Sequence, residues 1–245
     1  MAGYPGTELD ALAVARNYYR AILAYFTPYV GRRVVEVGAG IGTFSDFLLK
    51  CTKVTELTLI EPSDTLFPVL QHRFSGETRV KIMHSYGEHL SGSVAADSVV
   101  LVNVLEHVAD DSALLRVAHS ALVPGGSLLV FVPAVPCLFG TLDKHFGHCR
   151  RYTKALLSQR VLKAGLRLVR LRYFNFPGVV TWFLASRVLK RRALGHLDVW
   201  LYDRWMVPLI SKLERWQEPP VGQSLIAIAL KQETRGGRGE THQLP

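Results

Sequence analysis

Three glycines and two carboxylates in the first quarter of the chain have the types and spacing of a nucleoside-binding site. The run Val34–Gly42, which reads VVEVGAGIG, is largely apolar before it ends in glycines. Glycine permits backbone conformations that are closed to other residues, and it lets a ligand lie against the main chain. Glu61 follows nineteen residues after Gly42. A carboxylate at this place can accept hydrogen bonds from both ribose hydroxyls of a nucleoside.

The residues around the glycines restrict the kind of nucleoside. A dinucleotide fingerprint needs G-x-G-x-x-G/A, but Thr43 stands at its third small position. Glu36, just before the turn, would repel a pyrophosphate and favour a cation. These two residues disfavour a nicotinamide oxidoreductase, and the lack of a G-K-[ST] sequence excludes a P-loop. Taken alone, Glu61 would be better explained as a solvated acid at a strand end, but its spacing from the glycine turn favours the ribose role.

A second cluster of reactive residue types lies between 143 and 153, in the run DKHFGHCRRYT. His145 and His148 are the candidate catalytic bases, because histidine titrates near neutral pH. Arg150 could bind an acidic substrate, or it could fasten the loop over the ligand. Asp143 could orient a histidine or cap a turn. His107 fits a structural role better than a catalytic one. The spacing of cysteines and histidines predicts no metal site.

Alternating strands and helices must position these residues, which predicts a doubly wound α/β sheet with its ligand beyond the carboxyl ends of the strands. Short apolar or β-branched runs predict strands at 33–37, 56–60, 79–83, 98–102, 127–132, 166–173 and 224–230. Helical spacing predicts helices at 7–26, 42–50, 64–72, 112–122 and 153–164, the last with Thr153 as N-cap and Gly165 at its end.

About fifty residues between the last two strands form an insertion, far longer than an ordinary loop. We expect one domain over 1–245, with a helical cap at 1–30, this helical insertion at 174–223 and a disordered tail at 232–245. Tyr173 and Trp182 belong to an aromatic set that could line an acceptor pocket. The basic run Arg187–Arg192 could contact a phosphate or an anionic bilayer. An ordinary packed helix pair or a dimer interface would also explain the segment.

The amino-acid composition restricts the classes of function that the chain can have. The 245 residues are 49% hydrophobic with a net charge of +9, which predicts a folded protein with anionic partners. Three cysteines, an odd number, favour a reducing compartment over a disulfide framework. The N-terminus shows no signal peptide pattern, and no apolar run is long enough to span a bilayer. These features predict a cytoplasmic protein, monomeric or homodimeric, with peripheral membrane contact as an option.

Four segments taken in order resemble the class I S-adenosylmethionine (SAM)-dependent methyltransferases, most of all the bacterial small-molecule group. They read EVGAGIG, LIEPS, VLVNVLEHV and LVPGGSLLVFVP, and the likeness extends from Val34 to about Tyr173. The resemblance implies a seven-stranded sheet with SAM in its first half and S-adenosylhomocysteine as the product. An acid that many members carry after the third strand has no obvious counterpart here. The cofactor residues that the resemblance implies are Tyr19, Glu36, Gly38, Ala39, Gly40, Gly42, Glu61, Pro62, Ser85, Tyr86 and Asn103.

The function predicted from this resemblance is methyl transfer to oxygen, nitrogen or carbon of a small-molecule or lipid-linked metabolite, as in secondary metabolism. Arg150, Tyr173 and Trp182 are the candidate substrate-binding residues. The alternatives are an RNA methyltransferase, which the positive charge suggests, and a SAM-binding or membrane-peripheral protein without activity. Nucleic acid is the less favoured partner, because the Asn/Asp-Pro-Pro-Tyr-type motif found in many base N-methyltransferases does not follow the fourth strand.

Overall fold

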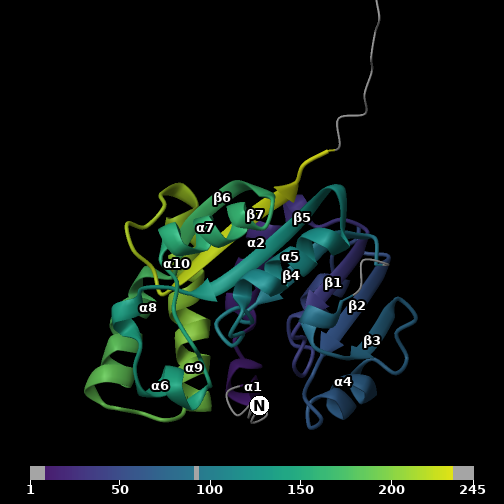
Figure 1. Ribbon diagram of the computed structural model, residues 1–245. Helices are drawn as coiled ribbons and strands as arrows, with labels where there is room; N and C mark the ends of the chain where they lie inside the picture. The colour runs from purple at the N-terminus through teal and green to yellow at the C-terminus, as the bar shows by residue number, and fades with distance from the viewer. Residues whose placement is uncertain (1–8, 91–93, 234–245) are drawn as a thin grey trace, which may run out of the picture.

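The computed structural model describes residues 9–90 and 94–233, and these form one seven-stranded sheet in the order β3-β2-β1-β4-β5-β7-β6 (Figure 1). Strands β1 to β5 pair in parallel, whereas β7 is antiparallel to both β5 and β6. This arrangement confirms the predicted doubly wound, mostly parallel sheet. The strands are β1 Arg33–Val37, β2 Glu56–Glu61, β3 Val80–His84, β4 Ala96–Val102, β5 Leu122–Pro133, β6 Leu166–Phe174 and β7 Ser224–Lys231.

The central strands are apolar on both sides because each face of the sheet is covered. Val99 and Leu101 of β4 belong to one buried cluster, while Val100 between them belongs to another. Leu128 and Leu129 of β5 divide between the two clusters in the same way. Successive side chains of a strand point to opposite faces, so a strand covered on both faces reads as a continuous apolar run.

The helices begin and end where local chemistry allows. Thr153 caps α7, since its hydroxyl accepts a hydrogen bond from the backbone N–H of Leu156 at 3.1 Å, and Gly165 follows the helix with φ +84°. Helix α4 begins at Phe67 rather than at 64, because Pro68 is tolerated only in a first turn. The helices before β6 are α1 Leu9–Leu12, α2 Arg16–Phe26, α3 Ser45–Leu49, α4 Phe67–Arg73, α5 Asp111–Ala121, α6 Thr141–His145 and α7 Lys154–Lys163.

The segment between β6 and β7 is helical, and its helices gather at the lower left in Figure 1. It contains α8 Phe176–Phe183, the π-helix η4 Leu184–Val188, α9 His196–Leu201, the π-helix η5 Tyr202–Met206 and α10 Val207–Trp216. Residues 1–8 of the expected cap and 234–245 of the expected tail lie outside the described residues. Within the described ranges, no helix is both long and apolar enough to cross a membrane.

Candidate functional site

A cavity of about 900 Å³ opens where β1, β2 and β4 end, which is where ligands of open α/β sheets bind. Its wall includes the last residues of these strands and the loops that follow them. Residues from the N-terminal helices and from the insertion complete it, among them Tyr18, Tyr19, Trp182 and Tyr202. The cavity therefore joins the predicted cofactor side to the predicted acceptor side.

The glycine turn forms one wall of this cavity through Gly38, Ala39 and Gly40. Gly38 has φ +72° and Gly40 has φ +57°, a region that side chains disfavour. A Cβ atom on Gly38 would lie 2.7 Å from Cγ2 of Val104. The backbone conformation therefore favours glycine at both positions, and the close packing against Val104 adds to this requirement at Gly38.

Gly42 has a different role from the one predicted. It does not line the cavity, although its φ is also positive, at +81°. A Cβ atom there would lie 2.5 Å from the ring of Phe74 and 3.0 Å from Leu70. Gly42 thus permits close packing of the turn against α4 and does not contact the ligand space.

Glu36 lies on β1 at the base of the cavity and is only 2% exposed. The hydroxyl of Ser45 donates a hydrogen bond to its Oε2 at 2.6 Å. Burial raises the pKa of the Glu36 carboxyl to about 8, and the Ser45 hydrogen bond offsets only part of this shift. A buried acid with this pKa would be ionised by a cation placed beside it.

Glu61 ends β2 and also faces the cavity. Its Oε2 accepts from the backbone N–H of Gly40 at 2.7 Å, and its Oε1 accepts from that of Ser63 at 2.9 Å. Burial raises the pKa of Glu61, while these two hydrogen bonds lower it. A carboxylate oxygen can accept more than one hydrogen bond, so Glu61 can hold the turn and still accept from ligand hydroxyls.

Of the other predicted cofactor residues, some line the cavity and others pack against neighbouring protein groups. Pro62, Tyr86 and Asn103 line the cavity, and Asn103 has the unusual φ of +53°. Tyr19 lines it too, but its ring packs edge-on and tilted against neighbouring aromatic rings. Ser85 does not line the cavity, and its hydroxyl donates to the carbonyl of Tyr86 at 3.2 Å.

Glu88 is a lining residue that the sequence analysis did not select. Many similar proteins carry an acid after the third strand, and no counterpart to it was predicted for this chain. Glu88 supplies an acid there, four residues after β3 ends, within the 3₁₀ turn Gly87–His89. Its position in the sequence was visible, but only the turn shows that it reaches the cavity.

These side chains fit a cationic nucleoside. The cavity floor holds two buried carboxylates, Glu36 and Glu61, that come from paired strands with Val37 opposite Ile60. A positive group beside Glu36 would favour its ionised form, and the Glu61 carboxylate can accept hydrogen bonds from hydroxyl donors. Gly38 and Gly40, which line the same cavity, carry no side chains of their own into it.

The sequence profile of a methyltransferase domain family matches residues 12–171, most of the chain. The chain belongs to the class I SAM-dependent methyltransferase family. SAM is therefore its cofactor, and Glu36, Glu61, Gly38 and Gly40 are predicted cofactor residues that line the cavity. The family and the cofactor confirm what the resemblance in the sequence implied.

Individual relatives of this methyltransferase agree with the family. The ubiquinone biosynthesis O-methyltransferase of Xanthomonas campestris pv. campestris (strain B100) is 30% identical over 208 residues, which cover 79% of this chain and 84% of that one. The enzyme of the same name from Xanthomonas axonopodis pv. citri is 30% identical over 131 residues, but the match spans only 52% of its length and 51% of this chain. Phosphoethanolamine N-methyltransferase 2 of Haemonchus contortus, solved with SAM, shares the fold, with a TM-score of 0.62, 18% identity and coverage of 89% of this chain and 53% of that one.

On the acceptor side of the methyltransferase, Asp143 is fully buried and gathers four hydrogen-bond donors. Nδ1 of His148 lies 3.0 Å from its Oδ1, and Nε of Arg151 donates to the same oxygen at 2.6 Å. Its Oδ2 accepts from Nε1 of Trp182 at 3.2 Å and from the backbone N–H of Gly140 at 2.9 Å. Burial alone would raise the pKa of Asp143, but these donors hold it below its ordinary value. Asp143 thus both caps α6 and orients a histidine.

The structure places some of the predicted catalytic and substrate-binding residues at the cavity and others away from it. His148 and Trp182 line the cavity, whereas His145 is exposed at the end of α6 and does not. Arg150 pairs with Asp111 at 2.9 Å and donates to the carbonyl of Ala109, so it fastens the loop to the domain. Tyr173 likewise lies off the cavity wall, beneath the ammonium group of Lys154.

Arg151, which the sequence analysis passed over, lines the cavity in place of Arg150. Its guanidinium lies 4.7 Å from the ring centroid of Trp182. Neighbouring arginines cannot be ranked from sequence alone, because only the fold decides which one turns inward.

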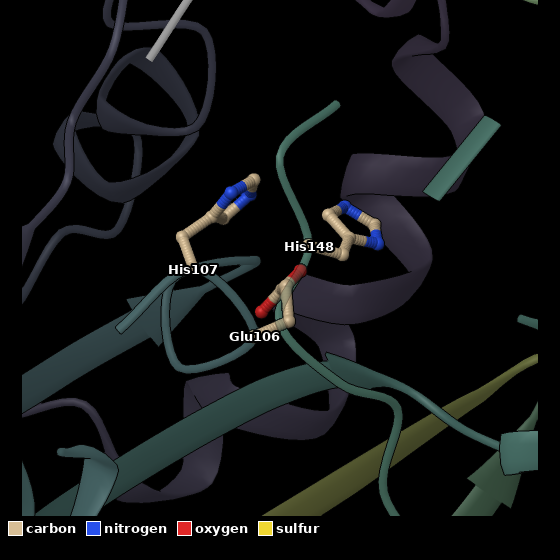
Figure 2. A group of neighbouring side chains, drawn as sticks. All are labelled: Glu106, His107 and His148. Carbon is tan, nitrogen blue, oxygen red and sulfur yellow. The ribbon is translucent and has the colours of Figure 1, made fainter. Parts of the chain in front are cut away.

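Glu106, His107 and His148 surround one point of the cavity wall (Figure 2). One donor atom from each residue lies within 4.8 Å of the other two, a grouping that could hold a metal ion. Among the described residues, neither oxygen of the fully buried Glu106 carboxylate has a hydrogen-bond partner from another residue, and burial raises its pKa to about 7. Burial, together with nearby His148, lowers the pKa of His107 to about 3. The sequence predicted no metal site. Because these three residues could hold a metal ion, that prediction needs an experimental test.

Proposed function

We propose that this methyltransferase transfers the methyl group of SAM to a small-molecule or lipid-linked acceptor, with a hydroxyl oxygen as the favoured target atom. The continuous cavity carries the proposal, because it joins Glu36 and Glu61 at one end to His148 and Trp182 at the other. Two relatives named as O-methyltransferases support the choice of oxygen. SAM supplies a methyl group that its positive sulfur has already activated.

The protein has to orient the acceptor, exclude water and remove one proton. Asp143 holds the proton-bearing Nδ1 of His148, which leaves Nε2 with a lone pair for the hydroxyl proton. Arg151 donates to the same Oδ1 of Asp143 at 2.6 Å and keeps the carboxylate ionised. Trp182 offers an apolar wall for the body of the acceptor.

Calorimetry with SAM tests the cofactor half of the proposal. The wild-type chain should bind SAM, and Glu61→Ala should abolish binding because the ribose hydroxyls lose their acceptor. Glu77→Ala is the matched control, since Glu77 is an acid outside the cavity that pairs with Arg79. A wild-type chain that does not bind SAM, or a Glu61→Ala variant with unchanged affinity, would overturn the proposal.

Methyl transfer to a panel of phenols, catechols and extracted lipids tests the acceptor half. Turnover with a hydroxylated acceptor supports it. A chain that binds SAM but modifies no member of the panel would instead favour the inactive SAM-binding alternative.

A further inference from the structure

The outer face of the last helical stretch carries an exposed apolar stripe. Helices α9, η5 and α10 follow one another without a break from His196 to Trp216. Residues four apart share one face of a helix, and along this stretch an exposed apolar residue recurs at every fourth position and then at 216. Trp205 is 65% and Trp216 is 94% exposed. The apolar stripe consists of Leu197, Leu201, Trp205, Leu209, Leu213 and Trp216.

The inner face of the same stretch is fixed to the domain by two buried acids. Oδ1 of Asp203 accepts from the backbone N–H of Tyr18 at 2.8 Å. The carboxylate of Glu214 accepts from the backbone N–H groups of Asn175 and Phe176, at 3.0 and 2.8 Å. Because these contacts fix the rotation of the helix, the apolar stripe cannot turn inward and stays on the surface.

The surroundings of the apolar stripe are strongly basic. Residues 184–216 contain seven lysines and arginines but only three acids. Two of these acids, Asp203 and Glu214, are buried, and the third, Asp198, pairs with Arg191 at 2.5 Å. A second copy of the chain would bring like charges together on this face, whereas an anionic surface would complement it.

We infer that the apolar stripe docks this methyltransferase on an anionic lipid bilayer. An amphipathic helix with basic residues beside exposed leucine and tryptophan lies in the plane of such an interface, with tryptophan at the level of the headgroups. Val199 and Tyr202, from the same stretch, line the cavity. If the proposed function holds, the docked enzyme takes an apolar acceptor directly from the bilayer, and docking itself does not depend on that condition.

Sedimentation of the full chain with vesicles tests the docking. The protein should pellet with vesicles of phosphatidylcholine mixed with phosphatidylglycerol, and much less with phosphatidylcholine alone. Leu209→Glu should weaken this partition by roughly 10-fold or more, because a charge replaces an apolar contact. Leu162→Glu is the matched control, since Leu162 on α7 is 54% exposed, as is Leu209.

Three other outcomes would overturn the inferred membrane docking. Equal pelleting of the wild type and Leu209→Glu, or no pelleting of the wild type, overturns it. So does a dimer in solution that Leu209→Glu dissociates while vesicle binding is absent. SAM binding by Leu209→Glu, measured by calorimetry, should equal that of the wild type, so loss of docking and loss of the proposed function are separate results.

Discussion

Nδ1 of His148 lies 3.0 Å from Oδ1 of Asp143, five residues earlier in the same segment. Asp143 also accepts from Trp182 in the insertion, so one carboxylate connects the loop after β5 to the helices that cover the acceptor side. A buried carboxylate with several donors stays ionised and holds each donor in one orientation. The insertion and the candidate base are therefore positioned together.

Replacing His148 with asparagine should lower kcat by about 10²- to 10⁴-fold, the usual contribution of a general base. The dissociation constant for SAM should stay unchanged, because His148 lies on the acceptor side of the cavity. Turnover with a hydroxylated acceptor and calorimetry with SAM measure the two effects. His145→Asn is the control, since His145 comes from the same segment but is exposed away from the cavity. Wild-type turnover by His148→Asn would remove the histidine from the mechanism.

The fold was predictable because it depends on local patterns. Each of the seven predicted strands overlaps an observed one, since covered parallel strands appear in sequence as short apolar runs. Thr153 and Gly165 marked the ends of α7 correctly, because caps follow from residue type. Helix α6 could not be foreseen. It has only five residues, and its capping acid, Asp143, is held by Arg151 and Trp182, which a sequence does not show to be neighbours.

The site was predictable only in its outline. Glu36 and Glu61 could be selected from the sequence because their strands and the glycine turn have a recognisable spacing, and both line the cavity. Whether Gly42 contacts the ligand or packs on Phe74 depends on the path of the turn. No local pattern in the sequence predicts that path. Likewise, the choice between Arg150 and Arg151 depends on which one Asp143 reaches.

Gly42→Ala should destabilise the fold by about 1–3 kcal/mol, because alanine is strained at positive φ and its Cβ would meet the Phe74 ring. Urea denaturation measures this change. Gly76→Ala is the matched control, since a Cβ there has nothing within 4 Å. If the folded Gly42→Ala variant lost SAM affinity without losing stability, Gly42 would be a ligand contact after all.

Removal of divalent cations should leave turnover unchanged. A cation bound by Glu106, His107 and His148 would occupy a ring nitrogen of His148, and the proposed base needs that lone pair. The measurement is kcat after dialysis against EDTA, with and without added Mg²⁺, Mn²⁺ or Zn²⁺. Loss of activity on dialysis and its return with one cation would identify the cluster as a metal centre and would contradict the base mechanism.

Glu36 should make the stability of the SAM-free protein fall as pH rises. The unfolded chain releases the Glu36 proton near pH 4.5, whereas the folded chain keeps it until about pH 8. Between these values the folded state binds one more proton, so the free energy of unfolding should decrease by about 1.4 kcal/mol per pH unit from this group.

Glutamine at position 36 has nearly the same shape and cannot ionise, so the stability of Glu36→Gln relative to wild type should increase steadily over this range. Urea denaturation of both proteins at several pH values measures the difference, in which the shared contributions of Glu106 and His107 cancel. A SAM ammonium beside Glu36 would favour the ionised carboxylate. The stabilisation of the wild type by SAM should therefore increase with pH. If Glu36→Gln still binds SAM, its stabilisation by SAM should not change with pH. A difference between the two proteins that does not change with pH would show that Glu36 is ionised in the SAM-free fold.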